Sequence, residues 1–418
     1  MRPSLRSTSF CIASQQIEAS SGRDFERYPA YAENDQGAVV GLGVSKARAL
    51  ELCKHSSSAA WAGSRPEADP MPVPDPDGWR VAAPEDVGLD GAVLGATGER
   101  FTAFTEANLH SLLVVRRGSL VYERYFVGED QAWADQLGRV SFDASTKHDV
   151  RSITKSVTAL LVGIAIERQL ISGIEELVFT YFPHCADLRT PQKDGIRLRH
   201  LLTMSPGFDW DEYRPFSDPH NSEARMYRSP DPYRFVLQQP LVTPPGKFFR
   251  YNSGATELLG GVLHRTTNRR LDDFAREVLF EPLGIADTAW NGFSNGIPAA
   301  NAGLRLRPRD MAKLGQLVLN RGQWNGRQII PETWIRDSSL PQIGRPDGIY
   351  FYGYQWWLGR SLVDKREVPW VAAMGRGGQH IFVVPEFDLV VVLTAGLYDN
   401  LALAWGPSIF SIAMCSRR

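Results

Sequence analysis

Cysteine, long apolar runs and surplus charge are all scarce in this chain. Its four cysteines are widely separated and form no Cys-x-x-Cys pair, which argues against a zinc ribbon or a redox pair and predicts unpaired structural thiols. No apolar run approaches the ~20 residues that a membrane-spanning helix needs, so we expect no membrane span. The formal net charge is −1, so no basic surplus predicts nucleic-acid binding.

Signals of other hydrolase classes are weak or absent. The chain reads Gly-x-Ser-x-Gly once, at Gly292–Gly296, but an α/β-hydrolase is not expected; it has no His-Glu-x-x-His, so a zinc peptidase is not supported either. Four of its histidines are dispersed and are expected to be structural or to lie on the surface: His148, His184, His200 and His264. We therefore predict no metal site and no cofactor.

The composition is that of an ordinary globular protein with room for two or so domains. The chain has 418 residues, of which 43% are hydrophobic and 22% charged. Its basic start has an apolar stretch too short for a signal peptide. We expect a cytoplasmic protein, or a periplasmic or secreted one if the start is misassigned. The sequence specifies no oligomeric state.

Strand signals lie at both ends of the ordered part of the chain, and helical signals lie between them. Two alternating apolar runs, 112–115 and 120–126, flank a glycine turn and predict a hairpin. A second hairpin is predicted from 380–384 and 389–393, around a turn that contains Pro385. Segregated strands and helices favour an α+β fold, in which both hairpins belong to one antiparallel sheet flanked by helices.

This pattern predicts three parts. Residues 1–75 are expected to be an irregular extension with one helix near Ser45–Lys54. Residues 76–155 and 290–418 are expected to form an α/β domain with the antiparallel sheet and a helix at Met311–Leu319. Residues 156–289 are expected to form an inserted, mostly helical domain that includes a helix at Ser253–Thr267. The active site would lie where the two domains meet.

The most informative motif is Ser152-Ile153-Thr154-Lys155, at the start of a strongly apolar segment. In a helix, residues i and i+3 lie on the same face, so Lys155 can reach the Ser152 hydroxyl. A serine hydroxyl becomes a nucleophile when a base takes its proton, and burial favours the neutral lysine amine that can do so. The motif is short, however, and occurs by chance in many chains.

Two more segments are candidates for the same site. Tyr251 follows a turn-rich loop and precedes a predicted helix, where its phenol can relay protons or simply pack under the helix. The glycine-rich segment 375–379 precedes a predicted strand. Its glycines allow a substrate close to the backbone, and the N–H groups of an edge strand can polarise a carbonyl as an oxyanion hole. The alternative is an ordinary glycine turn.

Taken in chain order, these segments resemble the penicillin-recognising serine hydrolases, and in particular the class C β-lactamase-like esterases and amidases. That family carries Ser-x-x-Lys, Tyr-x-Asn and Lys/His-x-Gly, and this chain has Ser152–Lys155, Tyr251–Ser253 and Ala373–Gly375. The stretches Arg199–Trp210 and Gly303–Ala312 also resemble family sequences. The resemblance spans about residues 79 to 401.

The resemblance implies a role for each matched residue. Ser152 would be the acylated nucleophile, and Lys155 would accept its proton or share it with Tyr251. Tyr251 would serve as general base and then as general acid. The backbone N–H groups of Ser152 and Arg376 would form the oxyanion hole. The expected substrate contacts are Tyr213, which is alternatively a packed loop aromatic, together with Ser253, Gly375 and Gly377.

Two departures from the family pattern bear on the substrate. Ser253 stands where the family usually has Asn, and Ala373 stands where it has the Lys or His that helps hold the carboxylate of a β-lactam. We therefore expect a small ester or linear amide as substrate, as in the nylon-oligomer hydrolase and carboxylesterase subgroup. The alternatives are a β-lactamase or D-Ala-D-Ala carboxypeptidase activity, and a non-catalytic binding protein on the same fold.

Overall fold

The structure is a computed structural model that describes residues 31–33, 39–41, 71–74, 78–133, 135–346, 348, 350–363 and 366–398. The helix expected near 45–54 lies outside these residues, as does most of the predicted extension. Two short strands of that extension, β1 (Tyr31–Glu33) and β2 (Val39–Gly41), pair antiparallel. Of the cysteines, Cys185 lies among the described residues and is a buried free thiol.

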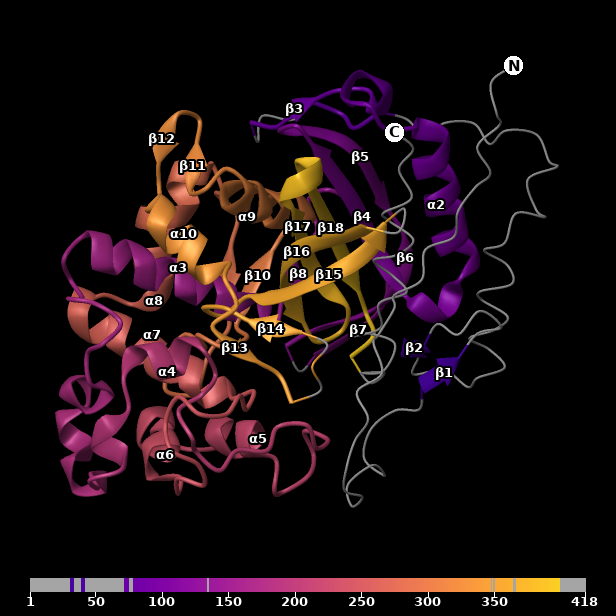
Figure 1. The fold of residues 1–418 in the computed structure, drawn as a ribbon. Helices are drawn as coiled ribbons and strands as arrows, with labels where there is room; N and C mark the ends of the chain where they lie inside the picture. Colours follow the sequence, from indigo (N-terminus) through magenta and orange to yellow (C-terminus); the bar gives the residue numbers. More distant parts are fainter. Residues whose placement is uncertain are drawn as a thin grey trace.

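A nine-stranded sheet forms the centre of the molecule (Figure 1), in the order β13-β14-β15-β16-β17-β18-β4-β5-β3. Both predicted hairpins are confirmed, and β18 pairs with β4, so they share one sheet as expected. Its pairs are antiparallel except β3 with β5. The strands are β3 (Arg80–Val81), β4 (Leu109–Arg116), β5 (Ser119–Tyr125), β13 (Ile343–Gly344), β14 (Phe351–Tyr352), β15 (Trp357–Val363), β16 (Arg366–Gly375), β17 (Gln379–Val384) and β18 (Leu389–Ala395).

Helices cover both faces of this sheet, which explains why its central strands β17 and β18 are buried throughout. Every residue of β17 and β18 is buried. Helix α2 (Gly91–Ala103) packs on β5, where Gly98 lies against Tyr122 and Arg124. Helix α9 (Pro308–Leu319) lies on the opposite side against β17 and β18 (Figure 1), with Gly315 against Val390 and Ile381. The α+β class predicted from the sequence is confirmed.

The helical segments between residues 153 and 275 lie to one side of the sheet (Figure 1). They are α3 (Ile153–Glu167), α4 (Leu198–Leu202), α5 (Ser222–Tyr227), α6 (Pro232–Gln238), α7 (Ser253–Thr267) and α8 (Leu271–Ala275), and α10 (Glu332–Ser338) follows later in the chain. The helix predicted at 253–267 is confirmed. Helix α3 is buried from Ile153 to Ala165 because it packs between α7 and the sheet. No helix among the described residues is long and apolar enough to cross a membrane.

Three small sheets surround these layers. The first joins β8 (His148–Asp149), β10 (Leu304–Leu306) and β9 (Ala289–Trp290), the second is the hairpin of β6 (Val127–Ala132) and β7 (Asp135–Ser141), and the third pairs β11 (Gln323–Trp324) with β12 (Arg327–Gln328). Strand β8 leads directly into the start of α3, so it fixes the position of Ser152. The division of the chain into domains stays a prediction.

One expectation about the sheet is wrong in detail. The strand that the glycine-rich segment precedes, β17, is not an edge strand, because it lies between β16 and β18, and β16 before the segment lies between β15 and β17. The pairing of β15 with β16 begins at Trp357 and Ala372, however, while β16 continues to Gly375 along β17. The last three residues of β16 therefore pair with β17 alone, which gives this short stretch the open side that an edge strand would have.

Candidate active site

Ser152 lies at the N-terminus of α3, with the Lys155 amine beside it. The Lys155 Nζ is 2.9 Å from the Ser152 Oγ and 3.0 Å from the main-chain oxygen of Asn301. Ser152 is half-buried, whereas Lys155 is almost fully buried because the apolar surface of α3 packs on every side. Arg151, directly before the serine, has a positive φ of 51°, and this tight bend brings the chain from β8 into the helix.

Tyr251 completes a group of three side chains. Its ring centroid is 5.0 Å from the Lys155 Nζ, and its phenol lies close enough to Ser152 for that hydroxyl to affect its pKa. Asn252 caps α7 by accepting a hydrogen bond from the Ala255 N–H, which fixes the segment that carries Tyr251. The Tyr251 ring is stacked on Trp357 at 5.6 Å. The structure therefore brings together the three residues that the sequence predicted to be catalytic.

The third predicted segment lies against the residues before Ser152. A Cβ on Gly375 would come 2.3 Å from the Val150 carbonyl oxygen, so only glycine allows this close approach. Gly377 has a φ of +92°, and a Cβ there would meet the Tyr398 ring. Arg376 lies between these glycines, and its Nε donates to the Tyr398 carbonyl oxygen at 2.8 Å. Ala373 is fully buried on β16.

Burial shifts the pKa values of the lysine and the tyrosine in opposite directions. It lowers the pKa of Lys155 below its usual range, although the carboxyls of Glu212, Glu223 and Glu257 act against this shift. Burial raises the pKa of Tyr251 well above its usual range, and the nearby Ser152 hydroxyl only partly offsets it. Burial thus shifts both groups toward their neutral forms, which are the amine that accepts a proton and the phenol that donates one.

Buried carboxyl groups near Lys155 were not predicted. Glu212 accepts hydrogen bonds from the backbone N–H and the hydroxyl of Ser253, at 2.7 and 2.9 Å, and from the Trp210 indole. Burial, followed by the Glu223 charge, raises the pKa of Glu212 to about 7, and burial raises that of Glu257 to about 8. Glu257 could have been identified as a candidate from the sequence, because it is the one charged residue on the apolar surface of α7.

Asn301 connects the lysine to these carboxyls, and it was also missed. Its backbone N–H donates to Glu257 Oε1 at 2.8 Å, and its side-chain amide donates to Glu223 at 2.6 Å. Its amide oxygen accepts from the Tyr227 hydroxyl at 2.6 Å. Tyr227 in turn packs edge-on against Trp133, at the tip of the β6–β7 hairpin. Asn301 lies in a loop without a local sequence pattern, so nothing short-range identified it.

The predicted substrate contacts fall in different surroundings. Tyr213 is 61% exposed, and it lies close enough to Tyr251 to raise the pKa of that residue. Ser253 is fully buried, and its hydroxyl is bonded to Glu212 as described above. Gly375 and Gly377 lie at the end of β16 beside Val150 and Tyr398. Their roles as substrate contacts stay predictions.

Comparison with known proteins defines the class to which this fold and this site belong. Residues 101–402 match the family model described as Beta-lactamase. Because the match covers more than half of the chain, the protein belongs to the beta-lactamase family, whose members are serine hydrolases.

Individual relatives are hydrolases of amides and esters. The chain is 26% identical over 316 residues to 6-aminohexanoate-dimer hydrolase of Paenarthrobacter ureafaciens. This alignment covers 70% of this chain and 74% of that protein. It is 28% identical over 148 residues to lovastatin esterase of Penicillium rubens, covering 32% and 34% of the two chains. The fold is also that of EstCE1, a hydrolase with promiscuous acyltransferase activity, with a TM-score of 0.57 over 75% of this chain and 96% of that one, at 16% identity.

Proposed function

We propose that the protein hydrolyses a small ester or linear amide through an acyl-enzyme on Ser152. The observation that carries this proposal is the buried Lys155 amine, 2.9 Å from the Ser152 hydroxyl. A buried amine of lowered pKa is a competent general base, and a hydroxyl at hydrogen-bond distance is within its reach. The Tyr251 phenol, close to the same hydroxyl, supplies the third group.

The arrangement supports one order of proton transfers. Lys155 takes the proton of Ser152 as its Oγ attacks the substrate carbonyl carbon. The backbone N–H groups of Ser152 and Arg376 stabilise the negative oxygen of the tetrahedral intermediate. The leaving group departs with a proton from Tyr251, which regains one from the Lys155 ammonium. Water then attacks the acyl-enzyme by the same steps in reverse and releases the acid.

Two observations favour esters and linear amides over β-lactams. Ala373 is buried and uncharged, so the position offers no cation for a β-lactam carboxylate. The Arg376 guanidinium donates to the Tyr398 carbonyl oxygen, and this contact occupies its Nε.

The test replaces the nucleophile and uses a neighbouring serine as control. Ser152→Ala should abolish the hydrolysis of p-nitrophenyl esters and labelling by a fluorophosphonate. Ser156→Ala, one turn further along α3, removes a hydroxyl that bonds the Gln355 carbonyl oxygen and should keep both activities. Ester hydrolysis that persists in a folded Ser152→Ala protein would refute the proposal. Rapid nitrocefin turnover would favour the β-lactamase alternative, and absence of labelling in the wild type would favour a binding protein.

A further inference from the structure

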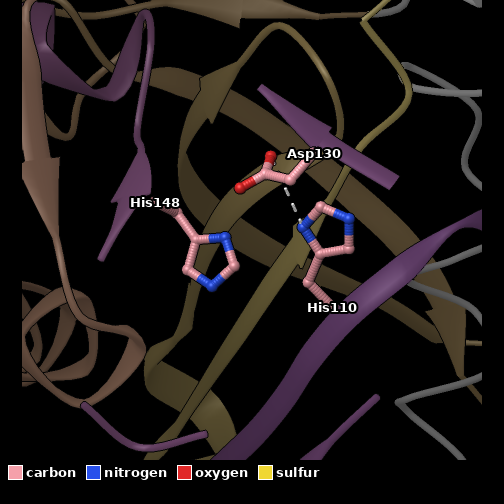
Figure 2. A group of neighbouring side chains, drawn as sticks. All are labelled: His110, Asp130 and His148. Carbon is pink, nitrogen blue, oxygen red and sulfur yellow. Dashed lines mark ion pairs between the residues drawn. The ribbon is translucent and has the colours of Figure 1, made fainter. Parts of the chain in front are cut away.

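Two histidines and an aspartate from three different sheets converge in the interior (Figure 2). His110 belongs to β4 of the central sheet, Asp130 to the β6–β7 hairpin, and His148 to β8. All three are buried, and their ligand-type atoms lie within 4.8 Å of one another. The His110 Nδ1 is 3.9 Å from Asp130 Oδ1. The cluster lies outside the Ser152 site and takes no part in the chemistry proposed above.

The hydrogen bonds of the histidines leave one nitrogen of each ring for a ligand. His110 Nε2 is 3.0 Å from the Glu129 carbonyl oxygen, which can only accept, so the ring proton is on Nε2 and Nδ1 keeps its lone pair. His148 Nε2 faces the Thr394 hydroxyl at 3.5 Å. Neither Nδ1 has a hydrogen-bond partner among the described residues. Figure 2 shows the rings beside Asp130, each with one nitrogen turned toward the group.

Buried polar atoms without partners are costly, and two in one cluster need an explanation. A metal ion would bind both Nδ1 atoms at once and so satisfy the two unpartnered nitrogens. The Tyr398 hydroxyl donates to Asp130 Oδ1 at 3.0 Å and orients this carboxylate, as outer-shell groups do in metal sites.

We propose that His110, Asp130 and His148 bind a divalent transition metal of the zinc type. Two imidazole nitrogens and one carboxylate oxygen are ligands that Zn²⁺ prefers, and a water molecule would complete a tetrahedral set. At zinc–ligand distances of about 2.0–2.2 Å the ligand atoms lie roughly 3.4 Å apart, so binding requires them to approach by up to about 1.4 Å from their present spacing of 4.8 Å or less. Two neighbouring cations, Arg305 and Arg151, share the Asp149 carboxylate at 3.1 and 3.2 Å.

The metal would join three sheets that share no strand. Its ligand His148 lies four residues before Ser152, and β8 is held to the central sheet by no backbone pairing among the described residues. A metal ion bound to β4, β6 and β8 would therefore fix the strand that carries the chain into α3. The role that follows is structural: the metal stabilises the fold and the position of the nucleophile without touching the substrate.

The experiment uses the full chain without a histidine tag, so that the tag cannot bind the metal. The wild-type protein is loaded with Zn²⁺, freed of excess by gel filtration, and its metal content is measured by mass spectrometry. We expect about one zinc per chain, and a visible absorption spectrum of tetrahedral Co²⁺ when cobalt replaces zinc. Removing the metal with a strong chelator should lower the midpoint of thermal unfolding, and Zn²⁺ should restore it.

Matched variants locate the site. Asp130→Asn and His148→Asn should bind less than a tenth of the wild-type metal, whereas His220→Asn, which removes an exposed histidine, should bind the full amount. Absence of metal and of a cobalt spectrum in the wild type would overturn the proposal. So would full metal content in folded Asp130→Asn and His148→Asn proteins. If these variants fail to fold, the wild-type stoichiometry, the cobalt spectrum and the reversible change in unfolding midpoint decide the question.

Discussion

Replacing Glu257 by glutamine should make the protein less sensitive to alkaline pH. Glu257 is fully buried on α7, one oxygen accepts the Asn301 N–H, and the other has no hydrogen-bond partner among the described residues. Burial raises the pKa of this carboxyl from 4.5 to about 8. A glutamine has the same shape and can still accept from Asn301, but it cannot ionise.

The magnitude follows from the linkage between proton binding and folding. An acid whose pKa is raised in the folded state stabilises that state at low pH, and this stability is lost as the pH rises from the unfolded to the folded pKa. Between about pH 6 and pH 8 the folded protein keeps the Glu257 proton that the unfolded chain has lost. In this range the free energy of unfolding therefore falls by about 1.4 kcal/mol for each pH unit. From about pH 6 to pH 9 this group alone should remove about 3 kcal/mol of the free energy of unfolding.

The assay is urea denaturation of the wild type and of Glu257→Gln at about pH 6 and pH 9. The variant should gain about 3 kcal/mol relative to the wild type between the two pH values. Glu367→Gln, on the surface of β16, is the control and should show a difference that does not change with pH. A Glu257→Gln difference equally independent of pH would refute the reasoning, because the buried carboxyl would then ionise as it does in water.

Two further predictions concern the catalytic lysine and the packing of its helix. The kcat/KM for an ester substrate should rise with pH through the pKa of Lys155, which burial places below 10.5. Lys155→Met should lower kcat/KM about 1,000-fold, because the general base is lost. A folded variant that keeps a tenth of the activity would contradict the assignment. Gly163→Ala should destabilise the protein by about 1–3 kcal/mol in urea denaturation, since the new Cβ would come 2.3 Å from the Trp334 ring. Gly195→Ala, where nothing lies within 4 Å, should be neutral, and equal effects of both changes would contradict the packing argument.

The parts that the sequence predicted well are those encoded over short distances. The two hairpins are alternating apolar runs around a turn, and α7 has the predicted bounds Ser253–Thr267. The distance between Ser152 and Lys155 follows from their spacing on one helix, so it could be anticipated without a fold. The sharing of one sheet by both hairpins was a consequence of the fold class, and the pairing of β18 with β4 confirms it.

The parts that were missed come from residues far apart in the chain. Glu212 and Glu257 approach Lys155 from a loop and from α7, and neither stands in a motif. His110, Asp130 and His148 lie on strands of three different sheets, and a two-residue strand such as β8 has no periodicity to detect. In each case the tertiary fold creates the cluster, and a short stretch of sequence does not show which distant residues will meet.

The pairing of β18 with β4 also has a consequence for biosynthesis. Val114 pairs with Val391, although most of the described residues lie between them in the sequence. At about 5–20 residues per second, a ribosome makes β4 roughly 15–55 seconds before β18. Throughout that time the β4–β5 hairpin exposes an apolar, unpaired edge that is prone to aggregation. A nascent chain of this protein should therefore depend on chaperones until its last strand emerges from the ribosome.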